Sequence, residues 1–388
     1  MNKRTLVTVV LMCGFVFSGN ALAVQFEGGV VGGSNASVSS HVAYLPSGSG
    51  TSSDYTYAGT QISTLGSFDI VINAGATLAS NPAALAAFNR AAAQWESRIS
   101  DPITINIDAD LGDLGSSSII GQSATTVLVS GYDSIRNDVV ADAGDEADDQ
   151  IVSHLPTYSQ FSASLPTDFS LDGNLMVSKA NLKALGATGL GSGADATITF
   201  NTAFSFDYDN SDGVTGGTMD FETVAAHELG HALGFISSVD EIDQTLDAGQ
   251  TTTIAPTTLD LFRFDNNGAG DPATTNDFTN FSRSLIPGND EITDQILTSW
   301  GTLSDAEFRM ATGYYEGDGR QASHWKDNLG IGIMDPTLTY GEVVAISEAD
   351  FRALDLIGYE IAPVPEPGTL VLLSIAMTLF IWRRRRRS

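Results

Sequence analysis

The chain has a single cysteine among its 388 residues, Cys13, and it lies inside an apolar run near the N-terminus. A lone cysteine cannot form a disulfide within the chain, and this one belongs to a segment that we expect to be removed on export. We therefore expect no disulfide, no thiolate nucleophile and no cysteine metal ligand in the mature protein. A metal site would have to use other ligands, such as histidine.

Basic residues are also scarce: Lys and Arg total 18 against 47 Asp and Glu, and the formal net charge is −29. Seven of the basic residues lie in the two terminal segments, as Lys3, Arg4 and Arg383 to Arg387, so the region between them is still more acidic. Such a surface repels DNA, RNA and anionic membranes, which argues against a nucleic-acid partner. It suits a soluble exported protein.

Long apolar runs occur only near the two ends of the chain. Residues 1–23 have the order of a secretory signal peptide: Lys3 and Arg4, an apolar run from Leu6 to Phe17, and the small-residue cleavage site Ala21-Leu22-Ala23. The run is too short to be a transmembrane helix. The sequence therefore predicts export.

The C-terminal segment, 363–388, contains Pro365-Glu366-Pro367, an apolar stretch from Thr369 to Trp382, and then five arginines. This order resembles the PEP-CTERM sorting signal of Gram-negative bacteria. The resemblance implies transient membrane association, recognition by an exosortase, cleavage near Pro-Glu-Pro and release to the cell surface or beyond. The alternative is a permanent tail anchor whose arginines stay in the cytoplasm. Both place the domain outside the cytoplasm.

Alternating and helical patterns between the two ends predict an α+β fold, with helices packed on one sheet. Strands are expected at Phe68 to Asn73, Ile103 to Ala109 and Ala196 to Asp207, and Leu259 to Phe264 is strand-like. Helices are expected from Pro82 to about Ile99 and, with a capped start at Ser347 and a glycine stop at Gly358, at the end of the domain. Residues 24–64 are rich in small residues. They are expected to form decorative strands, a loosely ordered lead-in or a pro-segment.

Two histidines and a glutamate stand together in His227-Glu228-Leu229-Gly230-His231. Positions i and i+4 share one face of a helix, so His227 and His231 can bind one metal ion. Glu228 lies about 100° around the helix, where it can hold a metal-bound water without binding the metal. Gly234 allows a sharp turn that sends the chain back beneath the metal.

A catalytic zinc ion needs a third protein ligand and an open position for water. Ser237, three residues after Gly234, is a poor ligand, and Asp240 is the next candidate. His324 is distant in sequence, but Met334 follows it in a turn that can form a soft apolar floor under the metal. We favour His324 and retain Asp240 as the alternative.

These motifs resemble those of the metzincin metalloproteases, which have His-Glu-x-x-His-x-x-Gly, a third ligand and a downstream methionine turn. Leishmanolysin-like members place a long insertion before the third histidine, and His324 with Met334 fits that variant. The resemblance implies a twisted, mainly parallel sheet with packed helices, an active-site helix and an irregular C-terminal subdomain. It divides the chain into a signal peptide (1–23), a lead-in (24–64), an N-terminal catalytic subdomain (65–235), a C-terminal subdomain (236–362) and a sorting segment (363–388).

The sequence-based hypothesis is a secreted zinc endopeptidase that acts on a protein or peptide substrate, with Glu228 as general base. The alternatives are a non-catalytic surface or matrix protein that retains a zinc site, and a zinc hydrolase acting on other bonds. A gluzincin arrangement would need a glutamate from a second helix, such as Glu241, and the break at Gly234 argues against it. Ca²⁺ is a further candidate cofactor, in the acidic turn Asp207 to Gly213.

Overall fold

The computed structural model describes residues 10–17, 67–145, 149–265, 272–288, 294–295 and 308–362. Most of the predicted signal peptide, the whole lead-in and the sorting segment therefore lie outside the described residues. In the part of the chain that is described, no helix has the length and apolar character needed to cross a membrane.

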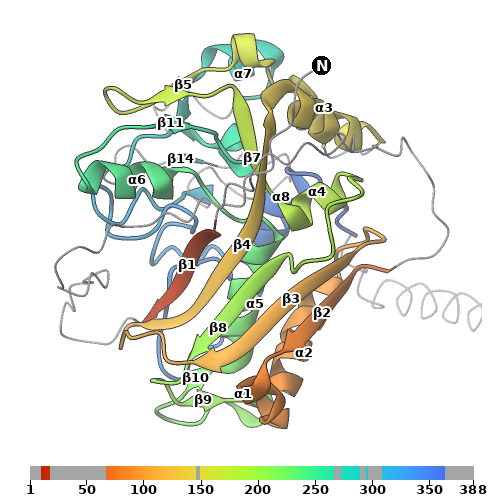
Figure 1. The fold of residues 1–388 in the computed structure, drawn as a ribbon, viewed down its shortest axis with the longest axis vertical. Coiled ribbons are helices and arrows are strands. Elements are labelled where there is room, and N and C mark those ends of the chain that lie inside the picture. The colour runs from red at the N-terminus through yellow and green to blue at the C-terminus, as the bar shows by residue number, and fades with distance from the viewer. Residues whose placement is uncertain are drawn as a thin grey trace, which may run out of the picture.

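The main sheet has seven strands (Figure 1). Its order is β15 (Thr337–Leu338), β1 (Val10–Phe17), β4 (Ile119–Gly131), β8 (Ala196–Asn201), β3 (Thr104–Gly112) and β2 (Asp69–Ala74), and β7 (Asn174–Ser178) also pairs with β4. Three pairings are parallel, and the three made by β4 are antiparallel. The expectation of a mainly parallel sheet is therefore corrected to a mixed one, because β4 runs against its neighbours.

The predicted strands Phe68 to Asn73 and Ile103 to Ala109 correspond to β2 and β3, and the predicted helix corresponds to α2 (Pro82–Glu96). The predicted strand Ala196 to Asp207 is divided, because β8 ends at Asn201 and residues Phe206–Asp207 form β9 in a separate small sheet. Asn81 caps α2 by accepting the backbone N–H of Ala84, and Pro82 occupies the first turn. Phe88 and Trp95 of α2 are wholly buried. Helices α2 and α5 (Phe221–Leu233) lie side by side behind the sheet (Figure 1). The sheet and these two helices form the core that supports the site.

Short elements make up much of the rest of the described chain. The helices are α1 (Ala76–Ala79), α3 (Tyr132–Asp142), α4 (Lys179–Ala184), α6 (Val239–Asp247), α7 (Thr275–Asn280) and α8 (Glu348–Asp355). The short strands are β5 (Ala163–Ser164), β6 (Ser170–Leu171), β9 (Phe206–Asp207), β10 (Met219–Asp220), β11 (Thr253–Ile254), β12 (Phe264–Asp265), β13 (Arg283–Ser284) and β14 (Asp294–Gln295). These short strands form small sheets of two and four strands, apart from the main sheet.

The stretch Leu259 to Phe264 alternates like a strand, but its first four residues form a 3₁₀ helix, Leu259–Phe262. The prediction of a strand there was wrong. Local side-chain bonds favour the turn: the Asp260 carboxylate accepts the backbone N–H of Thr257, and the Thr257 hydroxyl accepts that of Asp260. Helix α8 does end as its sequence suggests, because Gly358 adopts a φ of 102° shortly after it.

Candidate metal centre

Helix α5 carries the His-Glu-x-x-His motif and is buried along almost its whole length. Asp220 caps it by accepting the backbone N–H of Thr223. At the other end Gly234 adopts a φ of 129°, and the N–H of Phe235 reaches back to the carbonyl of Gly230. This is the left-handed turn expected from the glycine, and it directs the chain away from the helix axis.

Three imidazoles meet at one point beside α5. The Nε2 atoms of His227, His231 and His324 lie 3.1 to 3.2 Å from one another. Each Nδ1 faces a backbone carbonyl oxygen, at 2.7 Å for His227, 2.8 Å for His231 and 3.1 Å for His324. A carbonyl only accepts, so each Nδ1 carries the proton and each Nε2 directs a lone pair inward. Three converging lone pairs make this cluster a candidate metal-binding site.

Burial keeps these imidazoles neutral. All three side chains are essentially inaccessible to solvent. Desolvation lowers the pKa of His231 to about 4 and lowers the pKa of His227 and of His324 well below the usual value, with neighbouring imidazoles adding to the shift of these two. Neutral imidazole is the form that binds a metal ion.

The side chains of Asp240 and Ser237 make hydrogen bonds to other groups and do not belong to the histidine cluster. The Asp240 carboxylate accepts the backbone N–H groups of Ala322 and Ser323, next to His324. The Ser237 hydroxyl donates to Asp260. Among the described residues, the cluster of potential metal ligands consists of the three histidines alone. The geometry therefore favours His324 over Asp240 as the third ligand.

Met334 packs against α5, the helix that carries His227 and His231. A Cβ atom on Gly230 would come within 2.3 Å of the Met334 Sδ atom, so the glycine allows the methionine turn to pack against α5. The neighbouring Ile333 carbonyl accepts the Nδ1–H of His227. The methionine turn thus supports the site through packing and also orients one of the histidines.

Asp350 is a residue of the site that sequence reasoning missed. Its buried carboxylate accepts the backbone N–H groups of Ile333 and Met334 and the indole N–H of Trp325. It thereby joins the methionine turn to the residue that follows His324. The only signal in the sequence was its place in the capping box of α8, which indicates a helix start and nothing about the metal centre.

Glu228 is buried and faces the strand β4. A Cβ atom on Gly121 of β4 would lie 2.7 Å from Glu228 Oε1 and 3.0 Å from Val224 Cγ1. Glycine at this position therefore lets the sheet approach the carboxylate closely. Sequence reasoning did not single out Gly121, because nothing in the pattern of β4 shows what lies against it.

Replacing Gly121 with alanine should displace the Glu228 carboxylate, since it is the movable side chain at the contact. On the hypothesis that Glu228 is the general base of a zinc enzyme, we expect G121A to reduce turnover about 10-fold or more while zinc affinity stays within about 2-fold. Steady-state kinetics and metal titration of the same samples measure both quantities. G112A is the matched control, because its added Cβ would lie 3.3 Å from a Thr199 methyl group on β8. Equal loss of turnover in both variants would contradict this reading.

The acidic turn Asp207 to Gly213 is shaped by its own hydrogen bonds. Asp207 accepts the backbone N–H groups of Asp209 and Thr215, and Asp209 accepts that of Ser211. Hydrogen bonds lower the pKa of both carboxyl groups: first those from the side chains of Thr215 to Asp207 and of Ser211 to Asp209, and then these backbone bonds. Ca²⁺ binding at this turn stays a prediction.

Comparison with known proteins identifies the end of the chain. Residues 363–387 match the PEP-CTERM protein-sorting motif, which confirms the predicted sorting segment. No curated protein matches the chain, and no solved structure matches it. The motif is the address of secreted proteins that exosortase sorts to the cell surface in Gram-negative bacteria. The chain thus carries the sorting signal of a protein that is secreted to the cell surface.

Proposed function

We propose that the protein is a secreted zinc-dependent endopeptidase of metzincin type. The observation that carries the proposal is the spacing of the three Nε2 atoms, 3.1 to 3.2 Å. Ligands about 2.0 to 2.1 Å from a tetrahedral zinc ion lie about 3.3 Å apart, so the triangle is close to that of a three-histidine zinc site. Three protein ligands leave the fourth position for water, as catalytic zinc requires.

Zinc bound by His227, His231 and His324 would lower the pKa of a water molecule and polarise the scissile carbonyl. Glu228 follows the ligand His227 on α5 and is not one of the three residues in the ligand cluster. It accepts a proton from the attacking water and delivers that proton to the leaving amine. The Nδ1–H bonds to carbonyls hold the imidazoles in place throughout.

The edge of the sheet suggests how a peptide would lie. Strand β1 pairs antiparallel with β4 and parallel with β15, so an extended segment fits between these two strands. Residues 10–17 belong to the predicted signal peptide, and its removal would open this position to a substrate. Gly121 of β4, next to Glu228, pairs with Phe15 of β1. A peptide that replaced β1 would therefore run past the general base, bound through backbone hydrogen bonds.

The metzincin assignment is supported by two local features. Gly234 turns the chain after α5, and Met334 packs under that helix against Gly230. The ligand order matches the leishmanolysin-like variant, with a catalytic subdomain through residue 235, an insertion, and the third ligand and methionine turn in residues 236–362. In this proposal the sorting tail delivers the endopeptidase to the cell surface.

Metal removal tests the proposal. The mature domain, residues 24–362, is incubated with a mixed library of unstructured peptides, before and after treatment with a zinc chelator. We expect internal cleavage that chelation abolishes and added Zn²⁺ restores. Tight zinc binding without cleavage would favour a surface or matrix protein that retains the site. Cleavage of ester or other model substrates but no peptide would favour a zinc hydrolase of another class.

A further inference from the structure

Two aspartates of α6 hold the segment that leads to the third histidine. Asp240 and Asp243 stand three residues apart on one face of this helix, and both are buried. Each carboxylate accepts three hydrogen bonds from residues 312–325, which lie far away in sequence. Helix α6 begins shortly after the Gly234 turn, so it links the metal helix to the region that carries His324.

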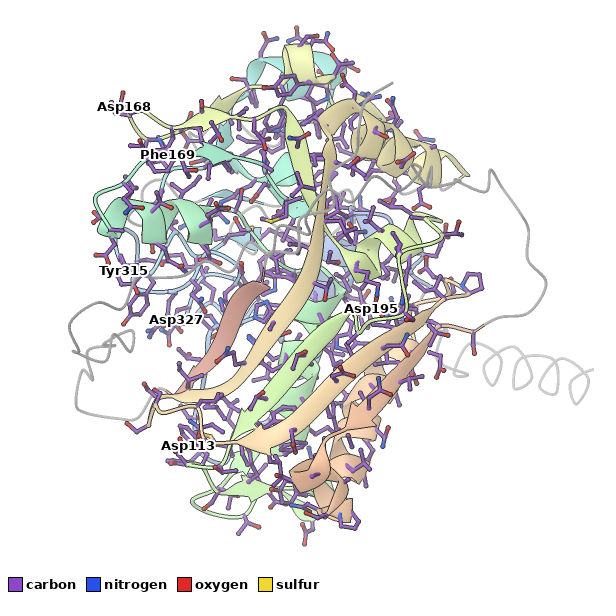
Figure 2. The ribbon with its side chains drawn as sticks, viewed as in Figure 1. Asp113, Asp168, Phe169, Asp195, Tyr315 and Asp327 are labelled. Atoms are coloured by element: carbon purple, nitrogen blue, oxygen red, sulfur yellow. The ribbon has the colours of Figure 1, made fainter. Side chains whose placement is uncertain are left out.

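The segment held by α6 is a hairpin with a base and a tip. Isolated bridges join Met310 to Trp325 and Gly313 to Arg320. Asp243 binds the tip, where it accepts the backbone N–H groups of Tyr314, Tyr315 and Glu316. Tyr315 lies at the outer margin of the molecule below α6 (Figure 2) and is 43% exposed.

Asp240 binds the base, directly before the third histidine. Its carboxylate accepts the backbone N–H groups of Ala322 and Ser323 and the hydroxyl of Ser323. Arg263, which also lies in the predicted insertion between Gly234 and His324, helps to hold this base. Its guanidinium donates to the carbonyls of Ala311 and Ala322. Asp240 is 3% exposed, so its hydrogen bonds form without competition from bulk water.

We propose that Asp240 is a positioning residue that places the His324 Nε2 atom at the metal centre. This inference rests on the proposed function for the identity of the metal. His227 and His231 are fixed by one rigid helix, whereas His324 comes from irregular backbone and depends on side-chain anchors. Without the Asp240 carboxylate, two buried backbone N–H groups would lose their acceptor, and residues 322–324 would move to recover hydrogen bonds. Outer partners of this kind commonly change metal affinity 10- to 100-fold.

The experiment compares D240N with D243N, since both substitutions remove one carboxylate from the same helix face. Zn²⁺ affinity is measured by competition with a chromophoric chelator, and the visible spectrum of the Co²⁺-loaded protein reports ligand geometry. We expect D240N to lose about 10- to 100-fold in affinity with an altered Co²⁺ spectrum. D243N should stay within about 2-fold of the parent protein and keep the parent spectrum. D240E restores a carboxylate on a longer side chain, and we expect its Zn²⁺ affinity to lie between those of D240N and the parent protein.

Several results would overturn the inference. Equal affinities and spectra for D240N and the parent protein would show that Asp240 does not position the ligand. Equal losses of Zn²⁺ affinity in D240N and D243N would show that any disturbance of α6 weakens the site, and not the loss of the Asp240 carboxylate in particular. S323A keeps the carboxylate and removes the hydroxyl that donates to Asp240 and accepts the backbone N–H of Ser237, so it tests the same point if D240N does not fold. We expect a smaller loss in S323A, and no loss would contradict the proposal. If the parent protein binds metal but cleaves no peptide, the proposed endopeptidase activity is refuted, whereas the role of Asp240 in metal binding still holds.

Discussion

Glu228→Gln should abolish peptide hydrolysis while zinc stays bound. Glutamine preserves the size of the side chain but cannot accept the proton of the attacking water, and general base catalysis contributes about 10²- to 10⁴-fold. The three imidazoles are unchanged, and their Nδ1–H bonds to carbonyls do not involve Glu228. We therefore expect kcat to fall by at least about 100-fold, with zinc content and peptide affinity near those of the parent protein.

The measurement combines steady-state cleavage of a fluorogenic peptide with zinc quantification in the same preparation. Glu222→Gln is the matched control, because Glu222 lies on the first turn of the same helix. Its carboxylate accepts hydrogen bonds from Arg90 and Gln94, away from the histidines. Full activity in E228Q would refute its role as general base. Loss of zinc in E228Q would indicate a structural defect in the site instead.

His324→Ala should remove most of the metal affinity and with it the activity. The variant leaves two histidines on α5, and a two-ligand site binds zinc far more weakly than a three-ligand site. We expect a fall in zinc affinity of more than about 100-fold, beyond the range of an outer partner such as Asp240. Because His324 is buried, the variant also creates a small cavity, so thermal unfolding is measured alongside zinc titration.

His154→Ala is the control for the loss of a histidine. The His154 ring bonds to Thr275 and lies near the ring of Phe278, apart from the three-histidine cluster. Its removal should leave zinc affinity unchanged. Unchanged zinc affinity in H324A, together with a loss of zinc affinity and a changed Co²⁺ spectrum in D240A, would identify Asp240 as the third ligand.

Several features of the fold follow from local sequence alone. The period-2 patterns of β2, β3 and β8 and the capped, alanine-rich α2 are properties of neighbouring residues, so they are legible without tertiary contacts. The same holds for the sorting tail, which is an ordered string of Pro-Glu-Pro, apolar run and arginines. The prediction at Leu259 to Phe264 was wrong because the bonds between Asp260 and Thr257 outweighed the alternating pattern.

The sequence by itself determined the pair His227 and His231, with Glu228 between them and a glycine turn after them, because helical geometry relates residues four apart. It offered both Asp240 and His324 as a third ligand, since no local rule relates residues so distant in the chain. Only the tertiary structure brought the Nε2 atom of His324 to 3.2 Å from those of the other two histidines. It also gave Asp240 another part, as acceptor for the residues before His324. The physical reason is that long-range placement depends on packing and on buried hydrogen bonds between segments, which a single sequence does not display.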